Sequence, residues 1–369
     1  MPDTSSPVLI QKGSILIYRV FDIAEEVNLP LVEKILLESA TGRLSITRGP
    51  RRAFVMRNAP VTMNLGEADV RLGQFGVKAE MSAKVWDYGV LSILFQIPIP
   101  PDTTWKQLLT RAVAAEDDAD LNEVADKKAR ELTQVLKPAL KSPHEWTVFE
   151  DYVIFFLEQV KGIENAQELL RQNIASLILA EEKETLAPRT RDTTLETTLQ
   201  YSEQDLVVID WNSAIVYERN GQRDIPDVIE FTLTHLMEMR YYDDLLDRRL
   251  GDLYDSVESR QNRLWRSRFA SLSHEASTRY IEFSEFIERV DNSLKVVGDF
   301  YLATVFRAAA RRFRLQEWQQ SITRKMGILA QVSELLQGEV NVWRSHLLEI
   351  VIIVLIIFEL ASAVFKVGH

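Results

Sequence analysis

The apolar stretch at residues 347–365 constrains the architecture of this chain more than any other feature. It reads LLEIVIIVLIIFELASAVF, and only four residues follow it. As a helix, a stretch of this length is about 28 Å long, close to the roughly 30 Å hydrocarbon core of a bilayer. We therefore expect a C-terminal transmembrane helix that anchors the chain by its tail. The alternative is a very apolar helix in the core of a helical bundle.

Two carboxylates lie within this expected membrane anchor. Glu349 stands near its start and Glu359 about two-thirds of the way along, whereas Ile353 and Phe358 belong to the run 350–358 without polar side chains. An ionised carboxylate inside a bilayer is costly, so Glu359 should be protonated, paired in a helix bundle or near the far interface. Because neighbouring subunits could satisfy it, we expect a homo-oligomer.

The composition excludes several classes of function. The formal net charge of -11 argues against a general nucleic-acid binder. The sequence contains no cysteine, which excludes disulfides, thiolate metal sites, iron–sulfur clusters and cysteine nucleophiles. Its first residues show neither an export signal nor a transit peptide. We therefore expect the bulk of the chain to lie in the cytoplasm.

Residues 1–221 have the pattern of an α+β head domain. Apolar residues alternate with polar ones over 77–85, which predicts a strand whose wet face includes Lys84. A turn at 87–89 and the apolar run 90–97 complete an expected hairpin. Further strands are expected at 14–21, 42–47, 52–56, 152–160, 205–210 and 214–218, and helices at 31–38 and 166–180.

Residues 222–346 predict a long antiparallel coiled-coil stalk whose third helix continues into the 347–365 stretch. Apolar residues recur there at the spacing of coiled-coil seams. The natural breaks are the polar segment 259–262 and the pair at 298–299. The three seams contain Leu246, Leu250, Leu253 and Val257; Phe283, Ile287, Val290, Leu294 and Val297; and Leu315, Trp318, Ile322, Met326, Leu329, Leu336, Val340 and Trp343.

One helical region is rich in carboxylates and contains a histidine, which resembles part of a metal site. Carboxylate-bridged di-iron bundles need Glu-x-x-His on two helices, whereas here the order is His235-x-x-Glu238 and occurs once. The acidic group at 243–247 precedes two arginines at 248–249, which favours ion pairs within the helix. Glycine-rich phosphate loops and the common hydrolase motifs do not occur. We therefore expect no metal, no cofactor and no catalytic residue.

A basic group lies at the expected corner between the first two stalk helices. Its four arginines around one tryptophan suit the headgroup region of a membrane. The alternative is an ordinary solvated turn in a helical hairpin. The group consists of Arg260, Arg263, Trp265, Arg266 and Arg268.

A second basic group is the densest in the chain. We call it the arginine patch, and it contains Arg307, Arg311, Arg312 and Arg314. It could contact a protein partner or an RNA backbone. The alternative is that these arginines balance an acidic neighbouring helix.

The end of the chain resembles the C-terminal signature of the family required for meiotic nuclear division. The resemblance rests on residues 344–349, the isoleucine-rich run 350–358 and Glu359, ten residues after the first glutamate. Residues 87–90 and 246–254 resemble two further segments of that family. It implies a membrane-anchored α+β protein with a coiled-coil stalk and no known enzymatic activity. Mitochondrial relatives support organellar translation; without a transit peptide, a bacterial protein on the inner face of the cytoplasmic membrane is expected here.

Two hypotheses about function follow. The first is a non-enzymatic, self-associating scaffold that is anchored in the membrane and binds an unidentified protein partner. The second is an enzyme or ligand sensor with a site in the head near Asp210, Trp211 and Asn212. A cleft with converging polar groups at that place would favour the second hypothesis.

Overall fold

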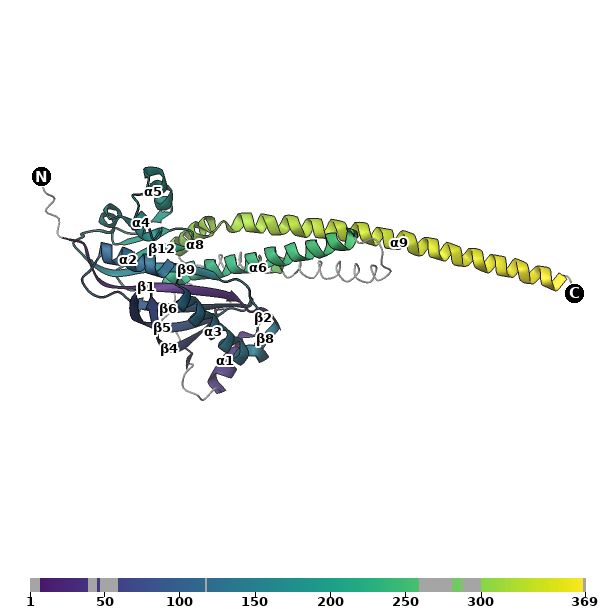
Figure 1. Ribbon diagram of the computed structural model, residues 1–369, viewed down its shortest axis with the longest axis horizontal. Helices are drawn as coiled ribbons and strands as arrows, with labels where there is room; N and C mark the ends of the chain where they lie inside the picture. The colour runs from purple at the N-terminus through teal and green to yellow at the C-terminus, as the bar shows by residue number, and fades with distance from the viewer. Residues whose placement is uncertain are drawn as a thin grey trace. The chain divides into compact units, whose positions relative to one another are not determined.

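The computed structural model describes residues 7–38, 45–46, 59–116, 118–258, 281, 283–285, 287 and 300–367 (Figure 1). The chain divides into two compact units. The first comprises Met1–Tyr241 and Arg289–Glu317, and the second comprises Tyr242–Glu288 and Trp318–His369. Two helices, α6 (Asp224–Glu258) and α9 (Leu315–Val367), contribute residues to both units.

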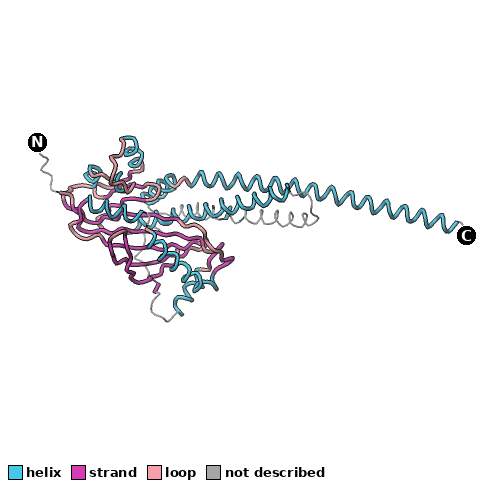
Figure 2. The backbone as a smooth tube through the Cα atoms, viewed as in Figure 1, coloured by secondary structure: helices cyan, strands magenta, loops and turns pink. Residues whose placement is uncertain are grey.

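The first unit is built on a large, mostly antiparallel sheet (Figure 2). Its strands are β1 (Leu9–Asp22), β3 (Ser45–Ile46), β4 (Val61–Leu72), β5 (Phe75–Val85), β6 (Val90–Pro98), β7 (Thr103–Thr104), β9 (Glu150–Lys161), β10 (Thr198–Leu199), β11 (Asp205–Ile209) and β12 (Ser213–Glu218). Among the described residues nine strands lie in the order β10-β11-β12-β9-β1-β6-β5-β4-β3, and β7 pairs with β1. The pair of β9 and β12 is parallel. A separate pair joins β2 (Ala24–Val27) to β8 (Leu140–Pro143).

Strand β1 lies inside the sheet, between β6 and β9. Its residues 13–22 are buried one after another, so both faces of the sheet are covered there. This explains why the sequence shows a continuous apolar run at 14–21 instead of alternation. The expected strands at 14–21 and 152–160 are confirmed by β1 and β9.

The hairpin expected from residues 77–97 is confirmed by the pairing of β5 with β6. The alternation holds for Ala79 and Met81, which are buried, but Lys84 is buried too although its position predicted a wet face. Its ammonium group pairs with Glu230 and, at 2.7 Å, with Asp227, both on α6. Burial lowers the pKa of Lys84, but the two carboxylates outweigh burial and the pKa is raised. A single sequence pattern could not reveal these partners, which lie more than 140 residues away.

Helices cover both faces of the sheet in the first unit. On one face, α2 (Trp105–Glu116) and α3 (Ala119–Leu136) share a core with β1 residues such as Ile17. On the other, the start of α6 packs with α8 (Phe300–Arg312): the Phe231 ring lies 5.4 Å from Trp86 and 5.9 Å from Phe306. The other helical elements described in this unit are α1 (Leu29–Glu38), η1 (Lys137–Ala139), η2 (Ala166–Arg171), α4 (Ile174–Ile178) and α5 (Pro188–Leu195). The single helix expected at 166–180 is thus two shorter ones.

In the second unit the later part of α6 packs against α9 through apolar residues and ion pairs. Lys325 of α9 lies 2.8 Å from Asp243 and 2.6 Å from Asp247, both on α6. Asp244 pairs with Arg248 one turn along its own helix, at 2.9 Å. Ion pairing within the helix is therefore confirmed for Asp244, whereas the other two carboxylates pair with α9.

The expected transmembrane helix is wrong. In the part of the chain that the structure describes, no helix is both long enough and apolar enough to cross a membrane. The prediction counted a length that includes two carboxylates. Glu349 and Glu359 bracket an uncharged run of only nine residues, 350–358, which as a helix is about 14 Å long, roughly half of a hydrocarbon core. The expectation that this stretch anchors the chain in a membrane is therefore wrong as well.

A break separates α8 from α9, where the sequence predicted one continuous helix. Helix α8 ends at Arg312 and α9 begins at Leu315. Between them Arg314 takes a left-handed backbone conformation with φ of 57°, which ends the helical hydrogen-bond pattern. No glycine or proline marks this break in the sequence.

Several expected features fall outside the described residues. They include the basic group around Trp265, the helix breaks at 259–262 and 298–299, the strand at 52–56 and most of the second coiled-coil seam. The side chains of Phe358 and Glu359 also lie outside them.

Candidate functional site

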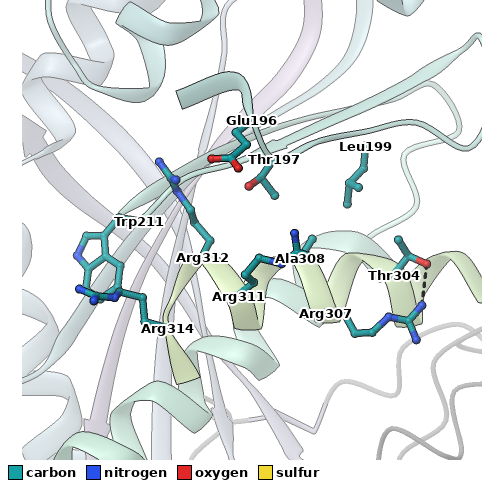
Figure 3. A pocket seen from close by; sticks show the side chains of 10 residues that line it. All are labelled: Glu196, Thr197, Leu199, Trp211, Thr304, Arg307, Ala308, Arg311, Arg312 and Arg314. Carbon is teal, nitrogen blue, oxygen red and sulfur yellow. Dashed lines mark hydrogen bonds between the residues drawn. The ribbon is translucent and has the colours of Figure 1, made fainter. Parts of the chain in front are cut away.

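A pocket of about 490 Å³ opens in the first unit beside α8 (Figure 3). Three segments line it: the chain from the end of α5 into β10, the turn between β11 and β12, and the outer face of α8 with the break that follows it. The lining residues are Glu196, Thr197, Leu199, Trp211, Thr304, Arg307, Ala308, Arg311, Arg312 and Arg314. The pocket thus unites the arginine patch with the Asp210–Asn212 segment, two candidates that the sequence proposed separately.

Helix α8 places its arginines on the pocket side because it is amphipathic. Thr304, Arg307, Ala308 and Arg311 line the pocket, and their spacing of three and four residues puts them on one helical face. The opposite face buries apolar side chains against the sheet. Helix packing therefore fixes the direction in which Arg307 and Arg311 point.

Arg312 holds the turn between β11 and β12. Its Nε donates to Asp210 Oδ1 at 2.7 Å, and Nη2 contacts the same oxygen. The backbone N–H of Trp211 also donates to this carboxylate, at 2.7 Å. The buried Tyr152 hydroxyl lies 2.9 Å from the carbonyl oxygens of both Asp210 and Ser213. Burial raises the pKa of Tyr152 well above its usual value, so this hydroxyl stays protonated and can donate to these carbonyl oxygens.

Arg314 extends the pocket beyond the end of α8. Its Nε donates to Glu317 Oε1 at 2.8 Å, and this hydrogen bond lowers the pKa of Glu317. Its positive φ is a conformation that glycine adopts at little cost and that side chains disfavour. This conformation ends the helical pattern of α8, and Arg314 lines the pocket directly after the break.

The arginines outnumber the carboxylates around this pocket. Asp210 pairs with Arg312 and Glu317 with Arg314, and Glu196 is the one carboxylate among the described lining residues.

Arg307 donates to the Thr304 hydroxyl at 3.1 Å and lies 5.8 Å over the Phe300 ring. Within the described part of the chain, no carboxylate forms an ion pair with Arg307 or Arg311. Arg312 and Arg314 do have carboxylate partners, but Asp210 lies in the turn between β11 and β12 and Glu317 in the first turn of α9, not on a neighbouring acidic helix. Two guanidinium groups remain able to bind an anion.

The other sequence candidates lie apart from this pocket. Burial lowers the pKa of His235 to about 3, so its imidazole is neutral. Glu230, five residues earlier on the same helix, pairs with Lys84. Among the described residues no group of three metal-ligating side chains comes together. On α9, Glu349 lies 3.6 Å from the His346 imidazole, and Ile353 is half exposed.

Sequence reasoning missed a buried polar group that lies away from the pocket. His144 Nε2 lies 3.0 Å from the buried Asp22 Oδ1, and the His144 ring stacks on Tyr241 at 4.7 Å. Nearby, Arg240 pairs with the buried Glu150. The sequence signal for the His144 contact was Asp22, which directly follows the expected strand at 14–21, and one acidic residue does not identify its partner.

The fold and the pocket define a mixed α/β protein with an arginine-lined pocket beside a large, mostly antiparallel sheet. The chain belongs to the family described as "Uncharacterized protein MJ0711, N-terminal domain", whose model matches residues 12–224. It is 20% identical over 265 residues to uncharacterized protein MJ0711 of Methanocaldococcus jannaschii, an alignment that covers 71% of this chain and 80% of that protein. The match to the family model includes the Trp211 turn and ends before α8.

Two expectations are corrected by these comparisons. The resemblance to the family required for meiotic nuclear division is wrong, because the family match covers the sheet-forming part of the chain and not the short C-terminal signature on which the resemblance relied. The expected location in a bacterial inner membrane is also wrong: the relative comes from an archaeon, and no membrane-spanning helix is found among the described residues.

Proposed function

We propose that this protein is a non-enzymatic binding protein for a phosphate-bearing small molecule, which occupies the pocket beside α8. The observation that carries the proposal is that Arg307 and Arg311 line this pocket without a carboxylate partner among the described residues. The planar guanidinium group presents several donors and matches the geometry of phosphate oxygens. The pocket volume of about 490 Å³ lies within the roughly 300–1,000 Å³ range of small-molecule sites.

The lining chemistry favours binding over catalysis. The described lining residues include arginine, threonine and one glutamate, but no histidine, lysine or activated nucleophile. Phosphoryl transfer also needs an attacking group that a base positions and activates. Among the described lining residues, Glu196 is the only carboxylate, and no activated nucleophile accompanies it. Of the two alternatives for the head, an enzyme or a ligand sensor, these residues therefore favour a ligand sensor.

Isothermal titration calorimetry of the full chain with pyrophosphate tests this proposal. We expect pyrophosphate to bind, and Arg311→Gln to weaken the affinity by about ten-fold, since a hydrogen bond to a charged group contributes roughly 1.5–3 kcal/mol. Arg307→Gln should weaken binding as well, since Arg307 lines the pocket without a carboxylate partner among the described residues.

The matched control is Arg191→Gln, an exposed arginine on α5 that does not line the pocket. Its affinity for pyrophosphate should equal that of the wild type. If pyrophosphate does not bind, or if both pocket variants bind it as tightly as the wild type, the proposal is wrong.

A second candidate function is self-association through α9. Residues 350–357 are all apolar and each is between 45 and 61% exposed. A contiguous apolar surface of this kind marks an interaction site more often than a free surface. Sedimentation velocity of the full chain should show a species heavier than one chain, and the double variant Ile353→Ser/Ile356→Ser should shift it to a single chain. Leu37→Ser, at an exposed position of α1, should leave the mass unchanged. A wild-type protein that sediments as one chain would rule this candidate out.

A further inference from the structure

We infer that the ligand is a nucleotide, whose aromatic base stacks on Trp211 while its phosphates meet the arginines of α8. This inference rests on the proposed function and adds the ligand class. The indole of Trp211 is 42% exposed and lines the same pocket as Arg307 and Arg311. An exposed tryptophan is a large apolar surface that water solvates poorly, so a rigid one inside a binding pocket indicates a stacking platform.

The turn that carries Trp211 is fixed before any ligand arrives. Its backbone is held by the Asp210 carboxylate, which Arg312 clamps in turn, and by the Tyr152 hydroxyl beneath it. The Tyr152 ring meets Phe313 edge to face, with centroids 5.4 Å apart. Because the backbone of the turn is already held, a ligand does not have to order it on binding, which favours affinity.

The aromatic side chain and the arginines of α8 lie at different points along the pocket, as a nucleotide would require. Figure 3 shows Trp211 and Arg314 at one end of the pocket and Thr304 and Arg307 at the other, with Arg311 between them along α8. A pocket of about 490 Å³ is far larger than a phosphate ion needs, since a water-sized group occupies about 30 Å³. A pocket of this volume has room for a base and a sugar beside the phosphates.

The wall opposite α8 supplies groups suited to a sugar. Glu196 and Thr197 face α8 across the pocket in Figure 3. A carboxylate accepts hydrogen bonds from hydroxyls and repels phosphate, so Glu196 favours a ribose beside it and leaves the phosphates to α8. The net charge of -11 argues against a longer nucleic acid as the occupant.

Calorimetry with three kinds of probe tests the inference: the four common ribonucleoside diphosphates in turn, ribose 5-phosphate and pyrophosphate. At least one nucleotide should bind more tightly than ribose 5-phosphate or pyrophosphate by about five-fold or more, since stacking of one base on an aromatic side chain contributes about 1–3 kcal/mol. Trp211→Leu should abolish that advantage, so that no nucleotide binds this variant more tightly than pyrophosphate does. Trp211→Phe should retain most of it, and Tyr201→Leu, an exposed aromatic that does not line this pocket, should retain all of it.

The outcomes separate the inference from the proposed function. If pyrophosphate binds as tightly as every nucleotide and Trp211→Leu changes nothing, the nucleotide inference is wrong and phosphate binding stands. If no phosphate compound binds, both are wrong. If a single-stranded RNA hexamer binds more tightly than any nucleotide, the pocket belongs to a nucleic-acid surface and the inference is overturned.

Discussion

Replacing Lys84 by methionine is expected to lower the free energy of unfolding by about 3–5 kcal/mol, the usual effect of removing one partner from a buried ion pair. Lys84 is the buried cation between Asp227 and Glu230. Methionine preserves most of the side-chain volume, so the cost comes from charge and not from a cavity. The Glu230 side chain is 1% exposed and would be left as a buried carboxylate beside Asp227. Urea unfolding of the wild type and the variant measures the difference.

Strand β5 offers a matched control for this experiment. Lys78 lies on the same strand with its side chain 74% exposed, 4.0 Å from Glu67. Because exposed pairs contribute about 0–1 kcal/mol, Lys78→Met should change the free energy of unfolding little. The double variant Lys84→Met/Glu230→Gln should recover part of the lost stability, since it removes the uncompensated charge. Equal effects at Lys84 and Lys78 would show that the buried pairs do not stabilise the sheet–helix contact.

Glu150 is expected to make the first unit less stable as the pH rises from about 4.5 to 7. Burial raises the pKa of this carboxyl to about 7, although Arg240 beside it acts in the opposite direction, whereas the ordinary value is 4.5. The folded protein therefore binds this proton more tightly than the unfolded chain does. Its stabilising contribution is complete below pH 4.5 and is lost as the pH passes 7. A difference of this size corresponds to about 3 kcal/mol.

The variant Glu150→Gln isolates this effect because glutamine resembles the protonated carboxyl. At pH 8 the variant should be more stable than the wild type by up to about 3 kcal/mol, and at pH 4.5 the two should be alike. Urea unfolding at both pH values measures this. Burial lowers the pKa of His144, but Asp22 outweighs it and the pKa is raised; this titration is common to both proteins and cancels in the comparison. Glu67→Gln, on an exposed carboxylate, is the control. A difference that does not vary with pH would contradict the prediction.

The sequence predicted the elements of the sheet better than their arrangement. Periodicity identified the hairpin of β5 and β6 and the buried strands β1 and β9, because local alternation and apolar runs report burial directly. It could not reveal that Lys84 is buried, since its partners are on a helix far along the chain. The hydropathy of residues 347–365 was misleading because the length of the apolar stretch was weighed more heavily than the two carboxylates inside it.

The sequence indicated both parts of the candidate site, but it did not indicate that they lie side by side. The arginine patch stood out by its charge and the Asp210–Asn212 segment by its position in a turn. Their contact depends on the ion pair of Arg312 with Asp210, which joins residues 102 positions apart. It depends as well on the left-handed Arg314, which ends α8 where no glycine or proline indicated a break. Neither this ion pair nor the left-handed residue can be recognised from the neighbouring sequence.

The parallel pairing of β9 with β12 has a consequence for the order in which the protein folds. Val153 pairs with Ser213, and the chain between them contains α4, α5 and β10, which include one wall of the pocket. A contact between such distant residues must wait until the intervening loop has closed. The hairpin of β11 and β12 that carries the Trp211 turn can form locally, but it reaches β9 only when this crossover is complete, and α8 adds the opposite wall from a still later part of the chain. The pocket is thus a late product of folding, and a ligand that binds it selects molecules whose first unit is fully assembled.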